Sequence, residues 1–315
     1  MKTEIAPPNN LNILLAGWLI RIIFFISLTI LILVPLTTLS TIIVLHFPNI
    51  PFIGGMLPVY FSVFVGFFIS SSVIEKLRLG RHWHTYGVSI NKFVPKDIWT
   101  GFSLAFGSML FIMFLGILFG NLPILNQYNL TLESLFLTIF IILFAATVEE
   151  FIFRGIIFQA FSQRFGFAIT ALISSILFAA GHVFNPSFSL LAMFNTFLAG
   201  LVLASMYHQT KSLWMPISFH FFWNLLQLFV LGSNVSGLED MGVPLFRMHL
   251  DTLPSWLFGG HYGIEGSIIA TFTLIVLIFL TAKNAYTYPD LSAFIFKRQI
   301  LENEILQARK LKKLQ

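Results

Sequence analysis

Three apolar stretches of this sequence carry ionisable or strongly polar side chains that could do chemistry together. They are Glu149, Glu150 and Arg154 in the first stretch, His182 in the second, and His220 and Asn224 in the third. Ionisable groups are costly at membrane depth, and those that occur there mark substrate sites, ion pathways or proton relays. We therefore take each of these side chains as a candidate functional residue.

The spacing in the first stretch separates the roles of its two glutamates. On a helix, residues four positions apart share a face, whereas adjacent residues point about 100° apart. Glu150 is thus predicted to face Arg154 and to form an ion pair with it, whereas Glu149 has no cation on its own face. We interpret Glu150 and Arg154 as structural support for the site, and Glu149 as the carboxylate that is free for chemistry.

The spacing between the stretches places the candidates at similar depth. Glu149 lies about 16 residues before a predicted turn at 165–166, and His182 lies about 16 residues after it. At 1.5 Å per residue, antiparallel helices put both roughly 25 Å from that turn. His220 and Asn224 are one turn apart on one helix face. We therefore expect all four side chains to be able to converge.

Buried polar residues can also act as hydrogen bonds between membrane helices without any catalytic role. For one such residue that interpretation would be reasonable. Because several of them lie on three separate predicted helices, a common site is the better interpretation.

The composition indicates which elements position these residues. The chain has 315 residues, of which 57% are hydrophobic and only 10% are charged, whereas a soluble domain carries about 25% charged residues. A span needs ~20 apolar residues, and eight segments qualify: 18–45, 52–74, 98–119, 132–158, 167–184, 188–208, 213–231 and 264–282. We predict a single membrane domain over 1–315, an all-α polytopic transmembrane helical bundle of about eight spans.

The positions of lysine and arginine orient this bundle. With a cytoplasmic N-terminus, 17 of the 18 Lys and Arg residues fall in inside segments, and only Arg247 lies outside. Cytoplasmic loops are enriched in these residues. We therefore predict that both termini are cytoplasmic, with a basic tail at 283–315, and that the loop at 232–261 lies on the opposite side. The expected location is the plasma membrane, as a multi-pass integral protein.

The polar residues also form three motifs that resemble those of a known family. Glu149-Glu150-x-x-x-Arg154, Phe178-x-x-x-His182 and His220-x-x-x-Asn224 occur in this order within about 145–225. They are similar to the motifs of the CPBP family, which comprises the type II CAAX prenyl endopeptidases and the bacteriocin-immunity-type membrane proteases.

The resemblance implies an intramembrane endopeptidase that hydrolyses peptide bonds of a membrane-associated or lipidated substrate. It implies that Glu149, helped by His182, activates a water, and that His220 and Asn224 stabilise the tetrahedral oxyanion. Hydrolysis of an amide in a low-dielectric cavity requires such a base and such donors. The expected partners are a peptide or protein substrate in or at the membrane and the lipid bilayer; no nucleic-acid partner is expected.

Zinc is an open alternative. Glu149, His182 and His220 would provide two His and one Glu ligand, with water as the fourth, which is a catalytic zinc set and would make the protein a metalloendopeptidase. We favour a site that requires no cofactor, because Glu149 cannot easily be both zinc ligand and base, and Glu150 is committed to Arg154. The chain has no Cys, which excludes thiol catalysis and Cys-ligated zinc.

Two other classes of function are compatible with ionisable residues in spans. A membrane transporter would use them as an ion pathway, although the sequence has no repeated half of the kind common in transporters. A non-catalytic membrane scaffold would recruit membrane partners, but it would have no need of Glu149.

Overall fold

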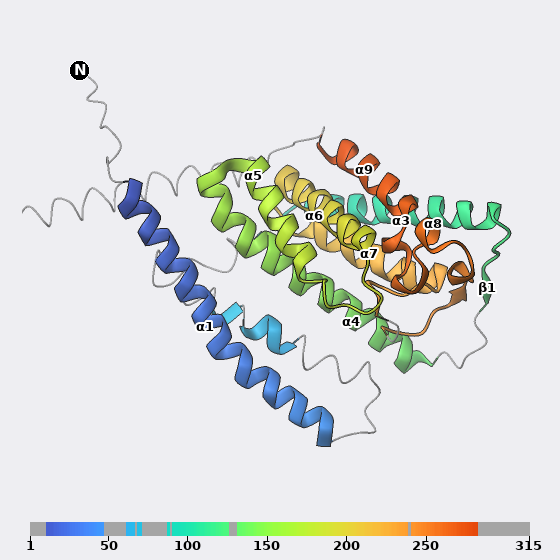
Figure 1. Cartoon of the computed structure of the whole chain (residues 1–315), viewed down its shortest axis with the longest axis horizontal. Helices are drawn as coiled ribbons and strands as arrows, with labels where there is room; N and C mark the ends of the chain where they lie inside the picture. Colours follow the sequence, from blue (N-terminus) through green and yellow to red (C-terminus); the bar gives the residue numbers. More distant parts are fainter. Residues whose placement is uncertain are drawn as a thin grey trace, which may run out of the picture.

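The computed structural model describes residues 11–46, 61–66, 68–70, 87–88, 90–125, 131–238 and 241–282, and these are mostly helical (Figure 1). The long helices are α1 (Leu11–His46), α3 (Val94–Leu118), α4 (Leu132–Glu150), α5 (Gln159–Ala180), α6 (Leu190–Thr210), α7 (Trp214–Leu231) and α9 (Ile268–Ala282). The predicted all-α class is confirmed for this part of the chain. The predicted basic tail, 283–315, lies outside the described residues.

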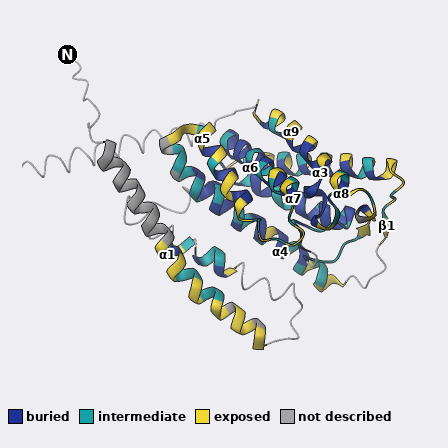
Figure 2. Ribbon diagram, viewed as in Figure 1, coloured by how far each residue is buried: buried dark blue, intermediate teal, exposed yellow. Residues whose placement is uncertain are grey.

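Four helical stretches in the described ranges are long and apolar enough to cross a membrane, namely Val94–Leu118, Leu132–Phe158, Leu190–Thr210 and Trp214–Leu231. Shorter apolar helices at Ser27–Ile43, Phe61–Ser70, Phe165–Ala180 and Ile268–Ala282 coincide with the other predicted segments. Large apolar side chains are exposed on the outer faces of these helices (Figure 2), as lipid contact requires. The count of eight spans and the cytoplasmic placement of the termini stay predictions.

The helix that carries the two adjacent glutamates changes its geometry directly after them. Its N-cap is Thr131, whose side chain accepts a hydrogen bond from the Ser134 N–H in a capping box. At Phe151 the α-helix becomes the π-helix η2 (Phe151–Phe158), which holds Arg154. π-Helical turns are rare and are frequently found at functional sites.

The predicted turn at 165–166 is present. Gly166 has φ 70° and ψ −176° within α5, a conformation that glycine adopts without a steric penalty. The chain folds back there, so that α5 packs against η2. This hairpin is what brings the end of α4 and the end of α5 to the same depth.

The fifth predicted segment, 167–184, ends as a helix earlier than predicted. α5 ends at Ala180 with Gly181 as its C-cap, and His182 lies in the turn that follows. Pro186 cannot continue a helix, and Ser189 caps the start of α6 by accepting a hydrogen bond from the Ala192 N–H. His182 is therefore held by a turn rather than by a helix.

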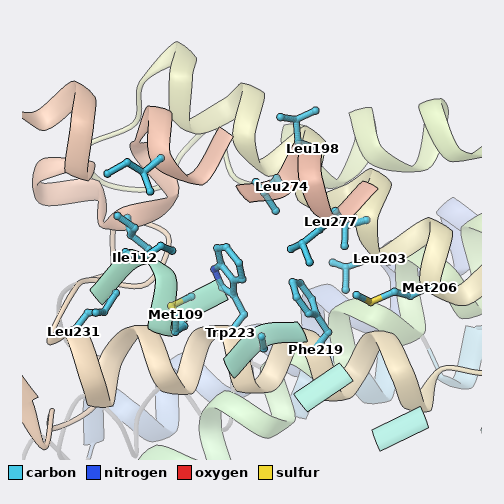
Figure 3. Close-up of a cluster of buried hydrophobic side chains, with 14 of the residues drawn as sticks. Met109, Ile112, Leu198, Leu203, Met206, Phe219, Trp223, Leu231, Leu274 and Leu277 are labelled. Atoms are coloured by element: carbon cyan, nitrogen blue, oxygen red, sulfur yellow. The ribbon is translucent and has the colours of Figure 1, made fainter. Parts of the chain in front are cut away.

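Close helix contacts hold the bundle around the site. α3 packs along α7 and α5 packs along α6. A Cβ on Gly101 would lie 2.6 Å from the Met215 carbonyl oxygen, and one on Gly200 would lie 2.8 Å from Ser175 Cβ. Small residues allow membrane helices to approach this closely. Beside these contacts lies the main apolar cluster, which includes Met109, Phe219, Trp223 and Leu274 (Figure 3).

The segment between α7 and α9, residues 232–267, is folded where the structure describes it. Its strand β2 (Phe246–Arg247) pairs antiparallel with β1 (Ile124–Leu125). The short helices η3 (Leu250–Thr252), α8 (Ser255–Phe258), η4 (Gly260–Tyr262) and η5 (Ile264–Gly266) follow. We call residues 232–267 the α7–α9 connection. Its last short helix, η5, packs against α6 and α9, so the end of this connection contacts the bundle core.

Candidate active site

The fold brings Glu149, His182 and His220 together, as their spacing predicts. Glu149 lies in the last turn of α4, His182 in the turn after α5, and His220 in the second turn of α7. Glu149 Oε2 is 3.9 Å from His182 Nε2 and 3.9 Å from His220 Nε2. Three side chains from three separate elements thus meet at one carboxylate oxygen.

The other ring nitrogen of each histidine is already occupied. His182 Nδ1 donates to the Phe178 carbonyl oxygen at 2.8 Å, because a carbonyl oxygen can only accept. His220 Nδ1 lies 3.0 Å from Glu150 Oε1 and donates to that oxygen. Each Nε2 therefore carries a lone pair when its ring is neutral and a proton when its ring is charged. Both of these nitrogens face Glu149.

Glu150 and Arg154 form the ion pair that their spacing predicts. Arg154 Nη1 lies 2.7 Å from Glu150 Oε1, and both side chains are completely buried. Arg154 Nη2 also donates to the Gly200 carbonyl oxygen of α6 at 3.1 Å. The pair therefore joins α4 and η2 to α6 and, through the Glu150–His220 bond, to α7.

Phe178 packs at the centre of this group, which gives the Phe-x-x-x-His motif a physical role. Its ring lies 4.6 Å from the guanidinium carbon of Arg154, in the geometry of a cation–π contact. Its ring centroid is 4.8 Å from that of His182 and 6.0 Å from that of His220. Phe178 thus fixes the guanidinium and both imidazoles at once.

A cavity of about 40 Å³ adjoins the two histidines, which exceeds the ~10–15 Å³ that one water needs. Asn224 lines it, on the same face of α7 as His220. Its other polar lining residues include Asn195, Ser236 and Glu265. Glu149 does not line this cavity itself, but its Oε2 faces the histidines that do.

Sequence reasoning missed Ser236 and Glu265. Glu265 lies inside the eighth predicted segment, 264–282, so the rule that flags ionisable residues within spans would have found it. Ser236 gave no signal, because it lies in a polar loop and reaches the site only through the fold of the α7–α9 connection.

The described residues give no support to the zinc alternative. No group of three or more His, Cys, Asp or Glu side chains among them has the arrangement that could hold a metal ion. This includes the set of Glu149, His182 and His220. Whether activity requires any cofactor is a separate question, and the expectation of a cofactor-free site stays a prediction.

The elements and the site together define a class: a membrane helical bundle with a buried glutamate–histidine centre. The family of type II CAAX prenyl endopeptidase Rce1-like proteins matches residues 131–226, a range that contains all three motifs. This match supports the assignment to the CAAX protease family that the motifs predicted. No curated protein matches the chain. The match to a protease family and the four helices of spanning length together support an integral membrane protein with a protease-type function at family level.

Proposed function

We propose that this protein is an intramembrane endopeptidase that hydrolyses peptide bonds of a membrane-associated or lipidated substrate. The observation that carries the proposal is the position of Glu149 Oε2, 3.9 Å from Nε2 of both His182 and His220. This oxygen is buried and has no hydrogen-bond partner among the described residues. A carboxylate oxygen without a hydrogen-bond partner is available to accept a proton, as a general base must.

In the proposed reaction Glu149 removes a proton from a water, and the water oxygen attacks the carbonyl carbon of the scissile bond. Two atoms 3.9 Å apart can share one water at ordinary hydrogen-bond lengths of ~2.8 Å, so the same water can contact Glu149 and His182. When the tetrahedral intermediate collapses, the carbon–nitrogen bond breaks and the leaving amine takes up the proton. The reaction needs no Ser or Cys nucleophile.

The oxyanion would be stabilised from α7. His220 Nδ1 is used by Glu150, so His220 can donate through Nε2 only when its ring is positively charged. A charged donor makes a stronger hydrogen bond than a neutral one. Asn224, one turn further along α7, supplies carboxamide N–H groups that donate in any protonation state.

The substrate class follows from the family and the surroundings of the site. The matched family is named for CAAX prenyl endopeptidases. For this chain we propose that the substrates are peptides held at the membrane by a lipid anchor or by their own apolar segment. The plasma membrane is the proposed location. Two helical stretches of spanning length, Leu132–Phe158 and Trp214–Leu231, carry Glu149, His220 and Asn224, which favours substrates that partition into the bilayer.

The experiment that tests this function compares new N-termini in membranes that contain the native protein, the Glu149→Gln variant or the Glu133→Gln control. Glu133 undergoes the same chemical change but lies exposed in the first turn of α4. We expect a set of cleaved termini that is shared by the native protein and the control and is absent with Glu149→Gln. Identical termini in all three samples would refute the proposal.

A further inference from the structure

Glu265 presents a third carboxylate to the cavity from outside the three motifs. It lies in η5 of the α7–α9 connection, and it lines the same cavity as His182, His220 and Asn224. Its Oε2 accepts two hydrogen bonds, from the Ser236 N–H at 2.6 Å and from the Ser236 hydroxyl at 2.9 Å. Both bonds that the described residues donate to this carboxylate end on Oε2, so Oε1 is available to a ligand.

The backbone that carries Glu265 is firmly anchored. Asn195 of α6 donates through Nδ2 to the carbonyl oxygens of Glu265, at 2.8 Å, and Ser267, at 2.7 Å. Asn195 Oδ1 in turn accepts from the Thr271 hydroxyl of α9 at 2.6 Å. The amide that holds the backbone of Glu265 is therefore itself held on both sides.

The backbone of Ser236 is also held in a defined conformation. Its φ of 51° lies in the left-handed region, which few residues other than glycine adopt. Its carbonyl oxygen accepts from Asn185 Nδ2 at 2.9 Å. This conformation lets the backbone N–H and the hydroxyl of one residue point at the same carboxylate oxygen.

Glu265 shares the cavity with His182 and His220, but it has no Lys or Arg partner in the described residues. Arg154, the buried cation of the site, is bound to Glu150, and no Lys or Arg in the described ranges forms an ion pair with Glu265. An opposite charge within a few ångströms favours the charged form of a buried carboxyl group.

We propose that Glu265 and Ser236 form a substrate subsite that binds a Lys or Arg side chain next to the scissile bond. This inference rests on the proposed function and narrows its substrate class to membrane-associated peptides with a basic residue at that position. Ser236 holds one carboxylate oxygen in place, and Oε1 receives the cationic group across the cavity. The subsite binds the substrate and fixes which peptide bond lies at the catalytic residues. It takes no part in the bond cleavage itself, since Glu149 is the base.

The test uses farnesylated C-terminal peptides that differ only by Lys or norleucine at one position near the expected cleavage site, with the farnesylated cysteine kept in every peptide. Norleucine has the length of the lysine stem without its charge. Dissociation constants are measured with the purified full chain carrying Glu149→Gln, so that no peptide is consumed. In this background we compare Glu265→Gln, Glu265→Asp and the exposed control Glu133→Gln.

We expect the Lys peptide to bind about tenfold more tightly than the norleucine peptide, the scale of one partly buried charge pair. Glu265→Gln should abolish this preference, because Gln can still accept from Ser236 but carries no charge. Glu265→Asp and Glu133→Gln should keep it. If Glu265→Gln fails to fold, the test uses the other two proteins. The preference for the Lys peptide should be present with Glu265 intact and should be retained in Glu265→Asp.

Equal binding of the two peptides, binding of neither, or a Lys preference that survives Glu265→Gln would overturn the subsite. Cleavage assays with Glu149 intact separate this result from the proposed function. Cleavage of both peptides at equal rates overturns the subsite and leaves the function standing. A Glu265-dependent Lys preference without cleavage leaves the subsite standing and counts against the function.

Discussion

Glu150 accepts a hydrogen bond from Nδ1 of His220 at 3.0 Å, although the two residues are 70 positions apart in the chain. The same imidazole faces Glu149 with its Nε2, 3.9 Å from Oε2. His220 therefore lies between two glutamates that are adjacent in sequence. Glu150 orients the imidazole ring, whereas Glu149 faces the opposite ring nitrogen, where we propose that the reaction takes place. The two carboxylates are therefore not interchangeable.

Replacing Glu150 with Gln should lower the stability of the protein. The change leaves Arg154 as a buried charge without its ion-pair partner, which typically costs about 3–5 kcal/mol. It also weakens the bond that orients His220, so turnover should fall as well. Thermal unfolding of the purified protein, measured beside turnover, checks both effects, with Glu133→Gln as the control that should change neither.

Removing the arginine at the same time provides a second check. The double variant Glu150→Gln with Arg154→Gln should melt at a higher temperature than Glu150→Gln alone, because the unpaired charge is gone. A charge swap of the two residues should not restore stability, since Arg154 also bonds Gly200 and packs on Phe178. A single Glu150→Gln variant that melts like the native protein would show that the pair is not needed for folding.

Local rules predicted much of the site from sequence. The Glu150–Arg154 pair follows from helix spacing, and the meeting of Glu149 with His182 follows from equal distances to a turn that contains Gly166. The π-helix after Glu150 could not be predicted, because no side-chain pattern in Phe151–Phe158 marks it. The Glu150–His220 bond and the contribution of Glu265 depend on how helices far apart in sequence pack, which local spacing does not encode.

Asn224→Ala should lower turnover by ~10²–10³-fold while substrate binding stays largely intact, the effect of losing one oxyanion donor. The reason is its place beside His220 on the cavity wall. Turnover and the dissociation constant measured on the same substrate distinguish the roles. If binding weakens as steeply as turnover, Asn224 positions the substrate or supports the fold instead.

Activity should survive exhaustive treatment with a strong zinc chelator. Glu149 is assigned as the base, Glu150 is held by Arg154, and the described residues contain no three-ligand group. The measurement is the cleavage rate before and after chelation, with metal content determined on the same sample. Loss of activity that stoichiometric zinc restores would move Glu149, His182 and His220 into a ligand set.

The topology can be checked by cysteine labelling, since the chain has no native Cys. Thr252→Cys, in the α7–α9 connection, and Lys92→Cys, just before α3, both alter exposed positions. The distribution of Lys and Arg predicts that an impermeant reagent reaches position 92 only from the cytoplasmic side and position 252 only from the opposite side. Labelling of position 252 from the cytoplasm would contradict the predicted orientation.

The most direct test of the central claim is the turnover of Glu149→Gln beside its melting temperature, in vesicles, on a substrate identified by the N-terminal comparison. Gln keeps the size of Glu149 and its ability to hydrogen-bond, but it cannot take a proton from water as a base. We predict a melting temperature close to that of the native protein, intact substrate binding, and a turnover lower by ~10²–10⁴-fold. A folded Glu149→Gln protein that cleaves at the native rate would contradict the account.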